Sequence, residues 1–196
     1  MRNHKRRALI VVDVQNDFCS GGALAVPGGD EIVPVINSLI RSGKFRYVYY
    51  TLDWHPENHC SFKDYGGAWP KHCVGGSSGA EFHPYLFVDR QEGVIIKKGT
   101  DRRKEAYSGF DGKDSDSGWD LGLWLKLTKA DEVYVCGLAT DYCVKATALD
   151  ARKQGFKTFV LRNACRGVEL NQGDVSQAIY EMAIEGIIVI ESEDIK

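Results

Sequence analysis

Short runs of apolar, mostly β-branched residues recur along the chain and predict its strands. The runs cover 8–14, 47–52, 94–97, 132–136, 158–161 and 187–190. Continuous apolar runs of this length are typical of strands that are buried on both faces, as in a parallel sheet.

Between most of these runs, apolar residues recur at helical spacing. Ile32, Ile36 and Leu39 predict a helix that starts after a glycine pair. Further helices are expected over 119–128, 140–154 and 174–185, and Gly155 and Gly186 end the last two. Strands that alternate with helices predict a single α/β domain: a doubly wound, Rossmann-like sheet of about six mostly parallel strands, with helices on both faces.

Two stretches, 53–93 and 99–118, lack strong periodicity and are expected to be long functional loops. Residues 1–7 are predicted to be a flexible basic tail, and residues 8–196 the domain. The apolar run after this tail has only five residues before Asp13, too short for a signal peptide. We therefore expect a cytoplasmic protein.

Composition narrows the function classes without naming one. The 196 residues are 43% hydrophobic and 27% charged, with a net charge of -2, which is ordinary for a globular domain. This charge gives no basic surface for nucleic acid or an anionic membrane, so neither partner is expected. The six cysteines are irregularly spaced, and we expect them to be thiols rather than a disulfide framework.

Chemically active side chains follow four of the predicted strands. Asp13, Asp53 and Lys98 stand at the ends of three apolar runs, and Cys143 follows the fourth in the segment GLATDYC. Ligands bind beyond the carboxyl ends of strands in open α/β sheets, so these residues are expected to converge. A cysteine in the first turn of a helix favours a thiolate and lies beside free N–H groups, which makes Cys143 the candidate nucleophile.

Asp13 and Lys98 are expected to form the partner pair of this cysteine. A carboxylate that emerges from an apolar strand is costly unless it is paired, and a lysine would satisfy it. Lys97 competes for this position, but the glycine that follows favours Lys98 at the strand end. The alternative is a structural ion pair at the sheet edge.

A carboxylate and several imidazoles in the first long loop predict a metal site. Asp53 and His55 are two residues apart and so face the same way in an extended segment, and His72 follows in the same glycine-rich loop. Carboxylate and imidazole ligands suit zinc or iron, with positions left open for water or substrate. His59 is a further candidate ligand, and Cys60 and Cys73 adjoin candidate ligands as alternatives.

These residues lie in blocks that resemble the nicotinamidase/pyrazinamidase family of the isochorismatase-like cysteine hydrolases. The matching blocks are ALIVVDVQNDFCSGGALAVPGGDEIV, TLDWHPENHCSF, GGAWPKHCVGGSSGAEFHP, KKGTDRRKEAYSGFDG and VCGLATDYCVKATALDA. Their order is that of the family, and they cover most of positions 8–151. The resemblance implies that residues 8–196 form an isochorismatase-like hydrolase domain that converts nicotinamide to nicotinate and ammonia in NAD salvage, with pyrazinamide as a side substrate.

The resemblance also implies a role for each matching residue. Asp13, Lys98 and Cys143 would be the catalytic triad, and the N–H groups of Ala139 and Cys143 the oxyanion hole, after a cis Leu138–Ala139 peptide. One divalent metal ion, with zinc preferred over iron or manganese, would be held by Asp53, His55 and His72. The implied substrate pocket is formed by Phe18, Trp69, Tyr107, Leu138 and Tyr142.

Three other interpretations account for parts of the sequence. A sibling amidohydrolase for N-carbamoyl or ureido substrates would keep the triad but does not need the metal-site residues. A metal-storing or thiol-sensing protein without turnover would not need the complete triad. A dehydrogenase would need a glycine-rich dinucleotide fingerprint, which the sequence lacks. A homo-oligomeric state is left open.

Overall fold

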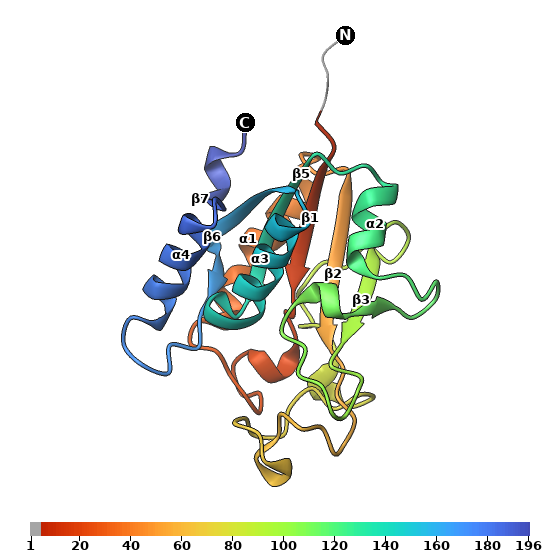
Figure 1. Ribbon diagram of the computed structural model, residues 1–196, viewed down its shortest axis with the longest axis vertical. Coiled ribbons are helices and arrows are strands. Elements are labelled where there is room, and N and C mark those ends of the chain that lie inside the picture. The colour runs from red at the N-terminus through yellow and green to blue at the C-terminus, as the bar shows by residue number, and fades with distance from the viewer. Residues whose placement is uncertain (1–4) are drawn as a thin grey trace.

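The computed structural model describes residues 5–196 of the chain, which form a seven-stranded sheet in the order β4-β3-β2-β1-β5-β6-β7 (Figure 1). The strands are β1 Arg7–Val12, β2 Tyr47–Asp53, β3 Val94–Lys98, β4 Lys113–Asp114, β5 Glu132–Leu138, β6 Lys157–Arg166 and β7 Ile188–Ile190. All neighbouring strands are parallel except β3 and β4. The predicted fold class is confirmed. The unpredicted strand β4 is two polar residues long and therefore leaves no apolar pattern.

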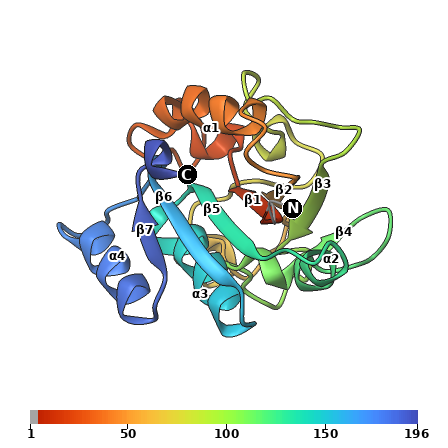
Figure 2. The same cartoon turned by 90° about the horizontal axis from the view of Figure 1, so that it is seen from above.

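The helices α1 Ile32–Arg41, α2 Leu121–Leu127, α3 Lys145–Lys153 and α4 Asp174–Ile184 cover the sheet. Figure 2 shows α1 on one face and α2, α3 and α4 on the other. The helix expected over 140–154 is interrupted, because a π-helical turn, Thr140–Val144, precedes α3. Asp120 caps α2, since its carboxylate accepts a hydrogen bond from Leu123 N at 2.8 Å.

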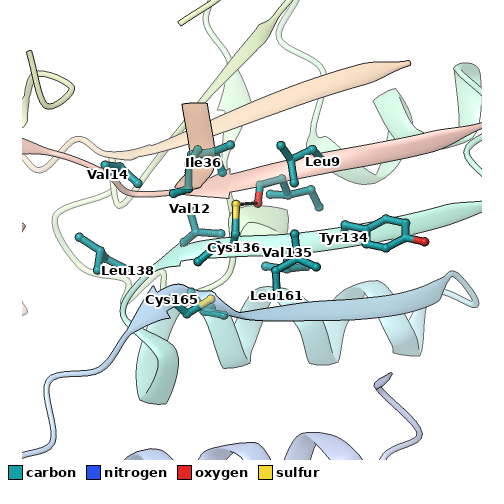
Figure 3. Packing of buried hydrophobic residues seen from close by; sticks show 14 of the residues in the cluster. Leu9, Val12, Val14, Ile36, Tyr134, Val135, Cys136, Leu138, Leu161 and Cys165 are labelled. Carbon is teal, nitrogen blue, oxygen red and sulfur yellow. Dashed lines mark hydrogen bonds between the residues drawn. The ribbon is translucent and has the colours of Figure 1, made fainter. Parts of the chain in front are cut away.

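The hydrophobic core lies on both faces of the central strands β1 and β5. Residues Ala8 to Val12 are all 0% exposed, which explains why β1 reads as an unbroken apolar run. Figure 3 shows Leu9 of β1 and Ile36 of α1 packed on one side of these strands. Val135 of β5 and Leu161 of β6 are also part of this core. Because these strands are packed on both faces, their ends, from which the loops extend, are held in fixed positions.

The basic segment predicted as a tail is described from Lys5 onward. Arg7 begins β1, and Arg6 pairs with Asp131 at 3.0 Å, so the predicted boundary between tail and domain lies too late in the chain. Residues 1–4 lie outside the described range. Within 5–196, no helix is long and apolar enough to cross a membrane. The cytoplasmic location and the oligomeric state stay predictions.

Candidate active site and metal centre

The candidate site lies at the carboxyl edge of the sheet, where four neighbouring strands end. Asp13 follows β1, Asp53 ends β2, Lys98 ends β3, and Cys143 lies in the turn after β5. Asp53 and Lys98 are directly opposite each other in the register of β2 and β3. In Figure 1 this edge is the lower one, and the long connection between β2 and β3 loops beneath it.

Lys98 is the centre of the cluster. Its Nζ lies 2.9 Å from Asp13 Oδ2, 2.5 Å from Asp53 Oδ1 and 3.4 Å from Cys143 Sγ. It also donates to Ala106 O at 3.1 Å, and the side chain is fully buried. Burial lowers the pKa of Lys98, but Asp13 and Asp53 outweigh it and hold the pKa well above its ordinary value. The lysine is therefore a cation shared by two carboxylates.

Asp13 is a buried carboxylate whose pKa is raised. Burial is the main cause, and the charge of Lys98 and the hydrogen bond from Thr51 Oγ1 to Asp13 Oδ1, at 2.5 Å, act in the opposite direction. The residue has a positive φ of 48°, which turns the chain as it leaves β1. A carboxylate with a raised pKa is a better proton acceptor, so Asp13 is suited to general base chemistry.

Cys143 differs from the sequence-based expectation in its ionisation. Burial raises the pKa of its thiol well above the ordinary value, and Asp13 and Asp53 add to the shift, although Lys98 opposes it. The cysteine lies 6% exposed in the π-helical turn before α3, beside two carboxylates, and these surroundings oppose the thiolate that a helix start alone favours. The thiol needs a base, and Asp13 belongs to the same cluster.

A second group of side chains adjoins this cluster and fits a metal ion. Asp53 Oδ2 lies 3.5 Å from His55 Nε2 and 3.9 Å from His72 Nε2, and one ligand atom from each residue lies within 4.8 Å of the others. His55 Nδ1 donates to Gly99 O at 3.0 Å, and His72 Nδ1 donates to Pro70 O at 2.7 Å. Since the carbonyls fix the protons on Nδ1, both Nε2 lone pairs are free for a cation.

His59 lies next to this group but is not part of it. Its Nδ1 lies 2.7 Å from Ser61 Oγ and its Nε2 lies 3.1 Å from Lys104 O, so both ring nitrogens are engaged elsewhere. The His59 ring packs against His55 with a centroid distance of 4.1 Å. Cys60 and Cys73, the alternative ligands, are also outside the group of Asp53, His55 and His72.

An aromatic pocket opens beside both groups and has a volume of about 470 Å³, mouth included. Its walls contain the expected Phe18, Trp69, Tyr107 and Tyr142, together with Ala139, Cys143 and the three metal-group residues. Trp69 Nε1 donates to Tyr107 Oη at 3.0 Å, and Trp69 meets Tyr142 edge to face at 4.9 Å. Leu138 is 1% exposed behind the wall rather than in it, and its peptide to Ala139 is cis.

Several residues of the site were missed from the sequence. Leu24, Val26, Glu105 and Val168 also line the pocket. Gln15 holds the backbone of Asp53 from both sides: it donates to Asp53 O and accepts from Asp53 N, each at 2.8 Å. The spacing D-x-Q at the end of β1 is the one pattern that could have indicated Gln15, because alternate residues share a face.

A buried thiol, a carboxylate and a lysine at the carboxyl edge of a doubly wound sheet are typical of cysteine hydrolases of the α/β class. Comparison with known protein families identifies one family within this class. Residues 7–194 match the family of the isochorismatase domain, and the chain belongs to this family.

Individual relatives are similar over most of their length. The chain is 46% identical to a nicotinamidase/pyrazinamidase of Mycobacterium tuberculosis, over 83% of this chain and 87% of that protein. It is 47% identical to a pyrazinamidase of Pyrococcus horikoshii solved in complex with zinc, with a TM-score of 0.86 and coverage of 95% and 99%. The structure of PnC1 from L. infantum in complex with nicotinate matches with 39% identity, a TM-score of 0.88 and coverage of 97% and 95%.

Proposed function

We propose that this protein is a nicotinamidase, which hydrolyses the carboxamide of nicotinamide to nicotinate and ammonia. The observation that carries the proposal is the Lys98 ammonium, which lies 3.4 Å from Cys143 Sγ and 2.9 Å from Asp13 Oδ2. The similarity to a nicotinamidase/pyrazinamidase and to a protein solved with nicotinate supports the same reaction.

In the first half of the reaction, Asp13 accepts the proton of the Cys143 thiol while Sγ attacks the carboxamide carbon. The carbonyl electron pair moves to oxygen, and the N–H groups of Ala139 and Cys143 stabilise this oxyanion. When the carbon–nitrogen bond breaks, the leaving nitrogen takes the proton from Asp13 and departs as ammonia. Lys98 stays protonated and balances the negative charge that moves between Asp13 and Sγ.

In the second half, water hydrolyses the thioester. Asp13 accepts a proton from the water as its oxygen attacks the acyl carbon, and the same backbone N–H groups hold the oxyanion. The carbon–sulfur bond then breaks, and Sγ recovers the proton from Asp13. The net reaction consumes one water and releases the acid, so the cluster returns to its starting state.

The carboxylate and imidazole group would hold one divalent metal ion through Asp53, His55 and His72. A mixed oxygen and nitrogen set suits zinc, and iron or manganese are the alternatives. When bound, such an ion acts as a Lewis acid that attracts the ring nitrogen of the substrate or a water molecule. The hydrogen bonds from both histidines to backbone carbonyls keep their rings in place for this role.

The aromatic walls would bind the flat ring of the substrate. Phe18, Trp69, Tyr107 and Tyr142 line the pocket beside Cys143, and aromatic side chains favour planar ligands. Pyrazinamide has a ring of the same shape with a nitrogen at the same place, so it is proposed as a side substrate.

The test measures ammonia release from nicotinamide by the wild type, by Cys143→Ala and by the control Cys60→Ser, with metal content determined on the same samples. We expect turnover in the wild type and in Cys60→Ser, and none in Cys143→Ala. Each of these proteins should hold about one metal ion in the candidate centre. A further variant, His72→Ala, should lose this ion. Turnover by a clean Cys143→Ala preparation would refute the nucleophile. A metal-loaded wild type that releases no ammonia would refute the substrate, and N-carbamoyl amides would be assayed next.

A further inference from the structure

A second group of potential metal ligands lies outside the mechanism described above. Cys19, Asp30 and His83 come from three separate segments, yet one ligand atom from each lies within 4.8 Å of the others. His83 Nε2 lies 3.2 Å from Asp30 Oδ1. Cys19 is 2% exposed, whereas the side chains of His83 and Asp30 are 12% and 38% exposed. The group therefore has a buried sulfur and an open side through which an ion can enter.

The three side chains are held in place by the backbone around them. Ser20 donates to Asp30 Oδ2 through its N–H, at 2.9 Å, and through its hydroxyl, which leaves Oδ1 directed at His83. His83 N donates to Val14 O at 2.9 Å and Cys19 N donates to Asn16 O at 3.1 Å, so both residues are tied to the end of β1. Ligands positioned in this way lose little freedom when they bind an ion.

The Cys19 sulfur lies in the buried hydrophobic core. Within residues 5–196 it has no hydrogen-bond partner, although the thiols of Cys73 and Cys136 each contact a backbone carbonyl. Burial, together with the charge of Asp30, raises the pKa of the Cys19 thiol to about 12. A bound cation would reverse this effect, because it favours the thiolate.

A similar group near the pocket does not offer the same arrangement. His59, Cys60 and Glu105 also have ligand atoms within 4.8 Å of one another. However, the ring nitrogens of His59 face a serine hydroxyl and a backbone carbonyl rather than another member of the group. In contrast, His83 Nε2 faces the Asp30 carboxylate, and the proton between them is the one that a metal ion replaces.

We propose that Cys19, Asp30 and His83 form a second metal site, for zinc or a cation of similar softness. Sulfur, nitrogen and oxygen ligands together suit zinc, and water would complete the four-coordinate shell. Binding releases the thiol proton of Cys19 to solvent, while the single ring proton of His83 moves from Nε2 to Nδ1, so affinity rises with pH. The weak contact from Tyr85 N to His83 Nδ1, at 3.3 Å, is lost because Nδ1 then carries the ring proton.

This site would brace one wall of the pocket. The segment between Cys19 and Asp30 carries Leu24 and Val26, which line the pocket. An ion shared by Cys19, Asp30 and His83 joins both ends of that segment to the loop at residue 83. Occupancy would therefore stabilise this wall without taking part in the chemistry at Cys143.

The test titrates reduced, metal-free Cys143→Ala protein with cobalt(II), because thiolate ligation to cobalt gives a charge-transfer band in the near ultraviolet. The group of Asp53, His55 and His72 contains no sulfur and gives no such band, so the two sites are read separately. We expect the band, and we expect Cys19→Ser to remove it together with one equivalent of bound metal. Asp30→Asn and His83→Gln, at more exposed positions, should weaken the same binding at least tenfold.

The matched control is Cys60→Ser in the same background, which should keep the band and the full equivalents. Absence of the band in Cys143→Ala would overturn the proposal. Survival of the band in Cys19→Ser, or its loss in Cys60→Ser, would also overturn it and would point to the group near the pocket. None of these outcomes depends on whether nicotinamide is the substrate.

Discussion

The two ends of the sheet both bury ionic side chains, but they balance the charges in opposite ways. At the carboxyl end, one cation, Lys98, serves the two buried carboxylates of Asp13 and Asp53. At the amino end, one buried carboxylate, Glu132, is surrounded by cations. Lys5 and Lys157 lie 2.6 and 3.1 Å from Oε1, and Arg7 lies 3.2 Å from Oε2.

The pKa values show what this difference means. Glu132 is 3% exposed, yet the hydrogen bonds from Lys5 and Lys157 overcome the effect of burial and lower its pKa to about 2. Burial instead raises the pKa of Asp13 and of Cys143 despite their neighbour Lys98. A carboxylate that is paired with several partly exposed cations, as Glu132 is, stays ionised and does not exchange protons near neutral pH. A single enclosed cation leaves groups that can exchange protons.

The largest effect is expected from Lys98→Met. Removal of the cation leaves two buried carboxylates without a counter-charge, which costs about 3–5 kcal/mol of stability and abolishes turnover. Lys97→Met is the matched control, because Lys97 points away from the cluster, with its Nζ 3.9 Å from the Trp54 ring centroid. It should cost no more than about 1 kcal/mol. Equal losses in urea denaturation of the two variants would contradict the central place of Lys98.

Asp13→Asn should separate reactivity from stability at the carboxyl end. The amide cannot accept the thiol proton, so kcat for ammonia release should fall by about three orders of magnitude or more. The circular dichroism spectrum should be that of the wild type, because the amide has the same shape. Near-normal kcat in this variant would remove Asp13 from the mechanism.

Glu132→Gln should give the reverse result at the amino end. The pKa of Glu132 is lowered from 4.5 to about 2, so its contribution to stability is complete above pH 4.5 and disappears as the pH falls towards 2. We expect a loss on the order of 2 kcal/mol at pH 7, with ammonia release unchanged. Urea denaturation at pH 7 and at pH 3 checks the sign, because the difference from the wild type should shrink at pH 3. A difference that grows in acid would contradict the assignment.

The smallest effect concerns the pocket rather than either ionic cluster. Trp69→Phe removes the hydrogen bond to Tyr107 while it keeps an aromatic ring, so KM should rise by several fold, or about 1 kcal/mol, at nearly constant kcat. Trp119→Phe, a change at a 41% exposed tryptophan, is the control and should leave both constants unchanged. A fall in kcat alone would indicate that Trp69 acts on the chemistry rather than on the ring.

Much of the carboxyl end could be predicted from the sequence, since apolar runs show where strands stop. The ends of β1, β2 and β3 placed Asp13, Asp53 and Lys98 at one edge, and parallel neighbours bring such ends together. The ionisation of Cys143 could not be predicted, because burial and two facing carboxylates decide it. The position of a cysteine at a helix start indicates neither its burial nor which carboxylates face it.

Other features depend on contacts that no local pattern records. Both ring nitrogens of His59 are engaged by Ser61 and Lys104, and the latter is distant in sequence. Glu132 pairs with Lys5 across the sheet, and Cys19, Asp30 and His83 meet only after three loops have folded. Such groupings follow from the strand order, which the sequence implies only through the handedness and adjacency rules of α/β folds.

The single connection between β2 and β3 has a consequence for how such a protein can change over evolutionary time. It carries His55, His72 and Trp69, whereas Asp13 and Cys143 stand on other connections of the sheet. Insertion or exchange of this one loop alters two of the three ion-holding residues and the Trp69 part of the ring wall together, and leaves the reactive thiol and its base where they are. Replacement of the β2–β3 connection alone is thus expected to change which substrates bind. Selectivity for the ring and dependence on a metal ion are expected to change together.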